Sequence, residues 1–305
     1  IISMKNKLII GLVFPQHGND RKDVPNIDEP ILNTNIEPSI LQVLPQGDNV
    51  RYIHNHKDLE NISDSEVKYY LCSIFITGLS VFKKFAENID KEKIIVGGVQ
   101  PTMTPEMFTD YSFKIVQGLC DDIYNTIEQS GQIVSGICNY NNLPRNDLYD
   151  TRYNSQIIPN RFHDQTCSSI NTSVGCTNNC EFCCTPVMYN RKIHKKPLNF
   201  LEMESRLMVH LNGTFDNVFI RDENFLMLND WKERLSVLNK TRLSDKYHCF
   251  ASADQIINTD VGFLKQNGMV LVNLDCGDIM ALDSYDKNLR LIEACKALRN
   301  QNILI

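Results

Sequence analysis

The chain has 305 residues, enough for two domains of ordinary size. Its 37 acidic and 31 basic residues leave a net charge of −6, which excludes a general electrostatic attraction to nucleic acid. No apolar run reaches the roughly 18 residues that a membrane span requires, so we expect no membrane partner. The odd count of eleven cysteines in a long chain indicates ligands and buried thiols rather than a disulfide framework, and predicts a reduced, cytoplasmic compartment.

The first half of the chain alternates strand-like and helix-like segments. Short apolar runs predict buried strands at 8–14, 67–74, 94–99 and 113–116. Amphipathic stretches predict helices at 80–90 and 121–130. Strands that alternate with helices favour a parallel, doubly wound (Rossmann-like) α/β domain over residues 1–139. Residues 140–165 show little periodicity and are typical of a linker.

From residue 166 the alternation resumes and continues to residue 305. The predicted strands are 168–174, 217–222, 247–252, 269–275 and 302–305. The predicted helices lie at about 199–212, 230–241, 259–267 and 286–299. Repeated β/α units indicate a partial barrel, in which the carboxyl ends of the strands carry the chemistry. The apolar run at 302–305 would form an edge that isolated domains avoid, so we expect the chain to be a fragment or a partner or second copy to cover this edge.

Three cysteines on one short segment carry the clearest chemical signal. Cys176, Cys180 and Cys183 have C-x3-C-x2-C spacing, directly after the predicted strand 168–174. Three thiolates this close on one loop can bind three irons of a [4Fe–4S] cluster. The fourth iron is then open to a small molecule, as in catalytic rather than structural metal sites. The spacing therefore predicts a catalytic iron–sulfur centre.

A structural zinc site is the alternative interpretation of the same cysteines. Cys184 or His194 would complete a tetrahedral ligand set. Zinc sites usually pair two short knuckles across a spacer of about a dozen or more residues. No second Cys/His pair follows the triplet at such a distance. The spacing favours the cluster, and a zinc-stapled interaction or regulatory module is the competing hypothesis.

The cysteine triplet resembles the signature of the radical S-adenosylmethionine (SAM) enzymes, and the similarity extends from about residue 166 to residue 305. The resemblance implies a partial barrel of which this chain lacks the last strand and C-terminal region. It also implies that Phe182 packs against the adenine of SAM, and that a donor such as flavodoxin or ferredoxin reduces the cluster. SAM would then be cleaved to a 5′-deoxyadenosyl radical, which abstracts hydrogen from a small-molecule or peptide substrate.

The ends of the predicted strands supply candidate contacts to SAM. Asp222 and Glu223 stand where the family has a Gly-Gly-Glu element that contacts the methionine amino group, although the glycines are absent here. The alternative for this turn is a capping side chain before the next helix. Ser252 or Asp254 is expected at the ribose hydroxyls, with helix capping an equal alternative for Asp254. Gly277 would let the backbone approach the adenine.

The first half resembles the cobalamin-binding domain that precedes many radical SAM barrels. Residues 94–106 resemble a Gly-Gly-x-x-Pro-Thr-x-x-Pro-Glu stretch, and residues 116–122 resemble the Val-x-Gly-Glu-Gly-Glu element that follows it, with its first Glu and second Gly lost. The Asp-x-His-x-x-Gly motif that supplies a cobalt ligand in other cobalamin domains is absent. Loops at the ends of strands are natural cofactor sites in such sheets. The candidate cobalamin contacts are Ser73, Thr77, Gly97 and Gly98, with helix capping an equal role for the first two.

The two resemblances imply an order of functions. The first is cobalamin-dependent C-methylation of a small metabolite or peptide by a radical SAM enzyme. The second uses the same radical for a rearrangement, cyclisation or oxidation without methyl transfer. The third is the zinc-stapled module, which metal analysis would separate from the other two.

Overall fold

The computed structural model describes residues 7–14, 49–53, 59, 62–138, 156–157, 166–180, 183–274 and 285–305. The chain divides into two compact units. The first unit comprises Ile1–Tyr149 together with Thr177–Lys192, and the second comprises Asp150–Cys176 and Ile193–Ile305. The sequence did not predict that Thr177–Lys192, which carries two of the three cysteines, groups with the first unit.

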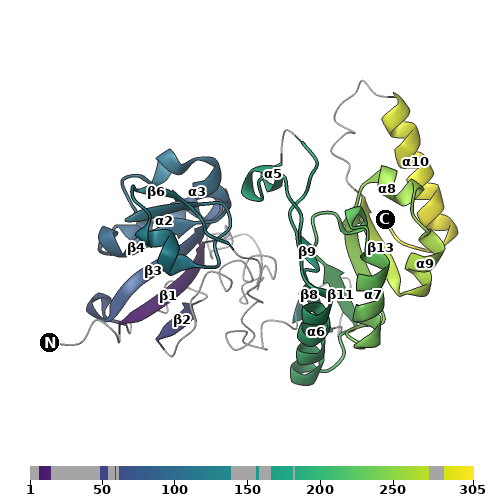
Figure 1. Ribbon diagram of the computed structural model, residues 1–305, viewed down its shortest axis with the longest axis horizontal. Coiled ribbons are helices and arrows are strands. Elements are labelled where there is room, and N and C mark those ends of the chain that lie inside the picture. The colour runs from purple at the N-terminus through teal and green to yellow at the C-terminus, as the bar shows by residue number, and fades with distance from the viewer. Residues whose placement is uncertain are drawn as a thin grey trace, which may run out of the picture. The chain divides into compact units, whose positions relative to one another are not determined.

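The first unit contains a six-stranded sheet of order β2-β1-β3-β4-β5-β6 (Figure 1). All neighbouring strands are parallel. The strands are β1 (Leu8–Phe14), β2 (Val50–Ile53), β3 (Val67–Ile74), β4 (Ile94–Gly97), β5 (Lys114–Gln117) and β6 (Ile133–Ser135). The predicted doubly wound α/β fold is therefore confirmed. The sequence missed β2 because the charged Arg51 interrupts its four residues, and it missed β6 because a run of three residues is too short to show a pattern.

Helices cover this sheet and bury both of its faces. They are α2 (Leu79–Ala86), α3 (Val99–Met103) and α4 (Ile123–Glu128), and α5 (Thr185–Met188), from the inserted segment, contacts α3. Side chains of a strand alternate between faces, so Ile10, Leu12 and Phe14 of β1 join one core cluster and Ile9 joins another. The strands therefore read as continuous apolar runs in the sequence, as parallel strands covered on both faces do.

The second unit contains a five-stranded sheet of order β13-β12-β11-β8-β7. The strands are β7 (Gln156–Ile157), β8 (Thr166–Ile170), β11 (Asn217–Ile220), β12 (Tyr247–Ala251) and β13 (Met269–Leu274). Four of them are mutually parallel, and β7 is antiparallel to β8. Among the described strands the sheet is open at β13, as a partial barrel requires.

The predicted strand 168–174 is wrong in its second part. β8 ends at Ile170, and Ser173–Val174 forms a separate short strand, β9, which pairs antiparallel with β10 (His194–Lys195). The chain leaves the sheet at Thr172, because Asp222, fifty positions along the sequence, takes the backbone N–H of Thr172 that a continuing strand would use.

Five helices of the second unit pack on one face of its sheet. They are α6 (Leu198–Asn212), α7 (Trp231–Lys240), α8 (Ala253–Ile257), α9 (Val261–Gln266) and α10 (Tyr285–Asn300) (Figure 1). Their apolar residues, such as Leu201, Leu235 and Leu298, share one core cluster with Val218 and Val272 of the strands. No helix among the described residues is long and apolar enough to cross a membrane.

Aromatic rings mark the other face of this sheet. The rings of Phe219 and His248 stack at 5.1 Å with an interplanar angle of 14°, and Phe250 meets Phe219 edge-on at 5.1 Å. None of the three belongs to the core cluster under the helices. Burial lowers the pKa of His248, so its imidazole is neutral at neutral pH.

The predicted last strand, 302–305, is only a single bridge. Leu304 bridges Leu271 of β13, with its N–H donating to the carbonyl of Val270 and its carbonyl accepting from the N–H of Val272. Ile303 is buried, whereas Leu304 and Ile305 are exposed.

Candidate functional site

A buried carboxylate after β11 fixes the segment that leads to the first cysteine. Asp222 is fully buried. Its Oδ1 accepts a hydrogen bond from the N–H of Thr172 at 2.6 Å, and its Oδ2 accepts from the hydroxyls of Thr172 at 2.6 Å and Ser173 at 2.7 Å. Burial raises the pKa of Asp222, and the hydrogen bonds from Thr172 and Ser173 oppose that rise. The side chain that the sequence predicted as a SAM contact thus has an internal partner, residues 172–173.

Glu223 binds the same segment at a position closer to the cysteines. Its Oε2 accepts a hydrogen bond at 2.9 Å from the N–H of Gly175, which directly precedes Cys176. Gly175 has φ of 93°, a conformation that strains other residues. Burial raises the pKa of Glu223 to about 7, and the negative charge of Asp222 adds to this rise. Near neutral pH the carboxyl group is therefore partly protonated.

A buried arginine, which the sequence did not predict as functional, holds the same segment from the other side. Arg234 of α7 is 2% exposed. Its Nη1 donates to the carbonyls of Thr172 and Lys196, both at 2.8 Å, and its Nη2 donates to Asp230 at 2.9 Å. The guanidinium thereby joins the two sides of the β9–β10 hairpin. Its spacing from Asp230 looked like an ordinary ion pair on a helix surface, so nothing in the sequence indicated burial.

The second and third cysteines close a turn within the first unit. The N–H of Cys183 donates to the carbonyl of Cys180 at 3.1 Å. Cys176 belongs to the second unit and is buried. Phe182 lies outside the described residues. Within the part of the chain that the structure describes, no three Cys, His, Asp or Glu side chains are gathered as a metal site. The three-cysteine ligand set therefore stays a prediction from the sequence.

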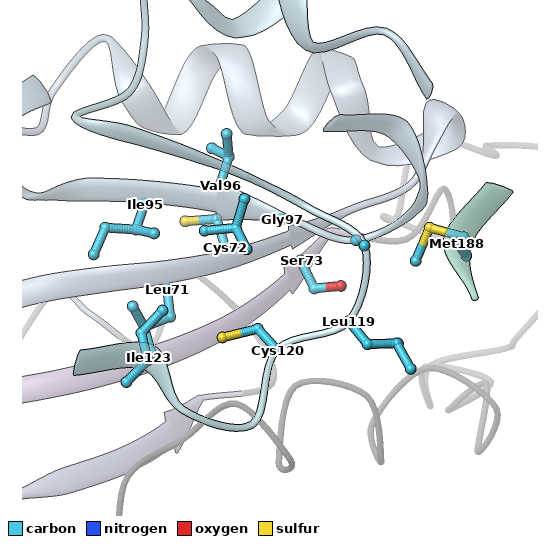
Figure 2. Close-up of a pocket in the computed structure, with 13 residues that line it drawn as sticks. Leu71, Cys72, Ser73, Ile95, Val96, Gly97, Leu119, Cys120, Ile123 and Met188 are labelled. Carbon is cyan, nitrogen blue, oxygen red and sulfur yellow. The ribbon is translucent and has the colours of Figure 1, made fainter. Parts of the chain in front are cut away.

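The first unit has a cavity at the carboxyl ends of β3, β4 and β5, with a volume of about 70 Å³ (Figure 2). Ser73, Gly97 and Gly98 line it, so the structure brings together three of the four predicted cobalamin contacts. A Cβ added to Gly98, which has φ of 94°, would lie 2.8 Å from the Ser73 hydroxyl. Thr77 lies in the turn Ile76–Gly78 and is not part of the lining. The apolar walls are Leu71, Ile95, Val116, Leu119 and Ile123.

The remaining predicted SAM contacts lie around α8. Ser252 is the N-cap of this helix, and its N–H donates to the side chain of Gln255 at 3.1 Å. Asp254 accepts from Arg290 of α10 at 2.6 Å, and both side chains of this ion pair are exposed. Gly277 lies outside the described residues. The structure thus gives Ser252 a capping role and Asp254 a partner on α10.

Comparison with known proteins finds solved structures with a similar fold. No family model matches the chain, and no curated protein is similar to it in sequence. The radical S-adenosylmethionine methyltransferase TsrM from Kitasatospora setae, solved with cobalamin and a [4Fe–4S] cluster bound, matches with a TM-score of 0.58 at 15% identity over 98% of this chain and 68% of that chain. TsrM solved with its tryptophan substrate and the SAM analogue aza-SAM matches with a TM-score of 0.60 at 14% identity, over 98% of this chain and 66% of that chain.

This chain therefore spans about two thirds of the length of TsrM. At such identities the likeness concerns the fold, which covers both units. The chain has the fold of a cobalamin-binding radical SAM methyltransferase, and the resemblance that the sequence predicted is confirmed at that level.

Proposed function

We propose that the chain is a radical SAM enzyme that uses cobalamin to methylate a carbon of a small-molecule or peptide substrate. The observation that carries this proposal is the position of the cysteine segment. C-x3-C-x2-C begins at Cys176, six residues after the first parallel strand of a TsrM-like second unit ends at Ile170. A sheet of the matching type precedes it, with a glycine-lined cavity at its carboxyl edge.

The donor set suits an iron–sulfur cluster. Cys176, Cys180 and Cys183 supply thiolates, the ligands that hold such clusters. Asp222, Glu223 and Arg234 hold residues 172–175 in place, so the approach to Cys176 is fixed before any cofactor binds. When bound, the cluster supplies the electron that cleaves SAM, and cobalamin carries the methyl group that is transferred.

The cavity of the first unit suits one part of a cobalamin. Its volume of about 70 Å³ gives room for several water molecules. Its apolar walls suit one edge of a flat apolar group such as the base of the nucleotide tail, whereas the rest of that base and the corrin ring must lie outside. The hydroxyl of Ser73 offers a hydrogen bond there, and Gly97 and Gly98 have no side chain to obstruct a ligand. Ligands of doubly wound sheets bind at this carboxyl edge.

Glu223 suits the amino group of SAM. A cation close to a carboxyl group favours its ionised form. An ammonium group beside Glu223 would therefore lower its pKa from about 7 and convert a partly protonated group into a carboxylate. The ionisation of Glu223 can be measured directly, because SAM binding should release protons near neutral pH.

The test is an anaerobic incubation of iron-loaded protein with SAM, with and without cobalamin, followed by mass spectrometry of the nucleosides. We expect 5′-deoxyadenosine from the wild type and none from Cys176→Ala/Cys180→Ala/Cys183→Ala. S-Adenosylhomocysteine that forms only with cobalamin would indicate methyl transfer, and its absence beside 5′-deoxyadenosine would favour radical chemistry without methylation. One zinc per chain and no nucleoside product would refute the proposal in favour of a zinc-stapled module.

A further inference from the structure

The segment that carries Cys180 and Cys183 also closes the cavity of the first unit. Met188, five residues after Cys183, lines that cavity and is the lining residue that comes from α5. It lies at the end of the cavity opposite Leu71 and Ile95 (Figure 2). Its backbone carbonyl would be 3.5 Å from a Cβ placed on Gly118. This close approach shows that the segment packs directly against the loop after β5.

The backbone between the cysteines and Met188 is short and hydrogen-bonded. The N–H of Cys183 donates to the carbonyl of Cys180 at 3.1 Å, and the N–H of Met188 donates to the carbonyl of Cys184 at 2.9 Å. α5 occupies Thr185–Met188, so one turn of helix separates the last cysteine from the cavity wall. A shift of Cys183 is therefore transmitted to Met188, because the described backbone from Cys183 to Met188 is short and ends in this helical turn.

The side chain of Met188 suits contact with a flat aromatic group. Methionine is flexible and polarisable, and its sulfur contacts aromatic rings favourably. Met188 is half-buried, whereas its neighbour Val187 is 54% exposed. Of these two adjacent apolar side chains, the structure thus turns Met188 toward the cavity.

We propose that Met188 binds cobalamin and couples the two cofactor sites, because the cluster holds Cys180 and Cys183 and thereby holds Met188 against the cavity. This inference rests on the proposed function and adds a residue and a linkage to it. Coupling between two sites is reciprocal, so cobalamin must strengthen cluster retention by the factor by which the cluster strengthens cobalamin binding.

The experiment measures hydroxocobalamin binding to the full chain by equilibrium dialysis under anaerobic conditions, before and after iron–sulfur reconstitution. After reconstitution, Met188→Ala should bind hydroxocobalamin about tenfold more weakly than wild type does, the scale of a lost sulfur–aromatic contact. Met188→Leu, of similar volume, should bind between wild type and the alanine variant. Met203→Ala on α6, where the side chain is 50% exposed, is the matched control and should bind as wild type does.

The linkage has its own readout in the same data. Removal of the cluster should weaken cobalamin binding to wild type about fivefold or more, within the usual range of coupling between sites. The same removal should change little in Met188→Ala, because the coupling contact is gone. Equal binding by Met188→Ala and wild type, or an equal cluster effect in both, would overturn the inference while the proposed function stands. A wild type that binds no hydroxocobalamin would overturn the cobalamin part of the proposed function as well.

Discussion

Replacement of Asp222 by alanine should destabilise the second unit strongly. The substitution removes one fully buried carboxylate that accepts three hydrogen bonds, from the N–H and hydroxyl of Thr172 and the hydroxyl of Ser173. Each buried donor left unpaired costs about 1–3 kcal/mol. The two hydroxyls can rotate toward other acceptors, but the backbone N–H cannot. We therefore expect a loss of about 3–5 kcal/mol in the free energy of unfolding, which is in the lower half of the range that three unpaired donors would give together.

Asp222→Asn separates the hydrogen bonds from the charge. The amide keeps a carbonyl oxygen for the N–H of Thr172, and its NH2 group can donate to the two hydroxyls once they turn. It is also neutral, so it avoids the burial of charge that raises the pKa of Asp222. The expected loss is about 1–2 kcal/mol, well below that of alanine.

The assay is urea unfolding of the cofactor-free protein followed by tryptophan fluorescence. Trp231 is the single tryptophan of the chain, and it lies buried in α7 of the second unit, so the signal reports this unit. Glu202→Gln, in an exposed ion pair of the same unit, is the control and should leave the midpoint unchanged. An Asp222→Ala curve that coincides with wild type would refute the reasoning, because the three hydrogen bonds would then stabilise nothing.

Three further predictions concern neighbouring features. The pKa of Glu223 is about 7 in the folded protein against 4.5 for an ordinary glutamate, so the folded state binds the proton more tightly. The stability that this proton provides is present below about pH 4.5 and is lost as the pH rises to about 7, by at most about 3 kcal/mol. In urea unfolding measured across this pH range, the dependence on pH should vanish in Glu223→Gln. Gly98→Ala should lower both thermal stability and cobalamin affinity, whereas Gly213→Ala, also at positive φ (80°) but with nothing within 4 Å of the added Cβ, should show only the backbone strain of about 1 kcal/mol. Arg234→Met removes the side-chain donor to the carbonyls of Thr172 and Lys196, and Thr172 keeps only the bond from the N–H of Lys196, so iron bound after reconstitution should fall well below wild type. The exposed Arg206→Met should bind a full complement, and equal iron in the two variants would contradict the role given to Arg234.

Local patterns predicted the elements of this fold, because each strand core is a short apolar run. The strand predicted at 67–74 is β3, and the helix predicted at 286–299 is α10 within one residue at each end. β4 ends at Gly97, two residues earlier than predicted, because Gly98 at φ of 94° turns the chain into α3. Such endings depend on backbone geometry that apolar periodicity does not encode.

The site was predictable only where its residues are adjacent in the sequence. The cysteine triplet is a local motif, and Ser73, Gly97 and Gly98 lie near the carboxyl ends of predicted strands that are neighbours in a parallel sheet. Arg234 and Met188 gave no such signal, because their partners lie far along the chain or in a segment that joins the other unit. No local pattern could assign them.

Three ionisable side chains converge on residues 172–175, and this concentration has a physical meaning. Asp222 and Arg234 are buried and Glu223 is half-buried, a costly arrangement that well-packed apolar side chains often match in stability. Their hydrogen bonds all go to the N–H, C=O or hydroxyl groups of this short segment, or to Lys196 and Asp230 beside it. Apolar packing could bury the segment but could not fix the direction of each peptide group, since it is not directional. In the proposed function this segment leads to a cluster ligand, Cys176, and needs that direction, because ligand geometry must be held within about half an ångström of its working position. The buried charges are therefore best explained by the demands of Cys176 rather than by the stability of the fold.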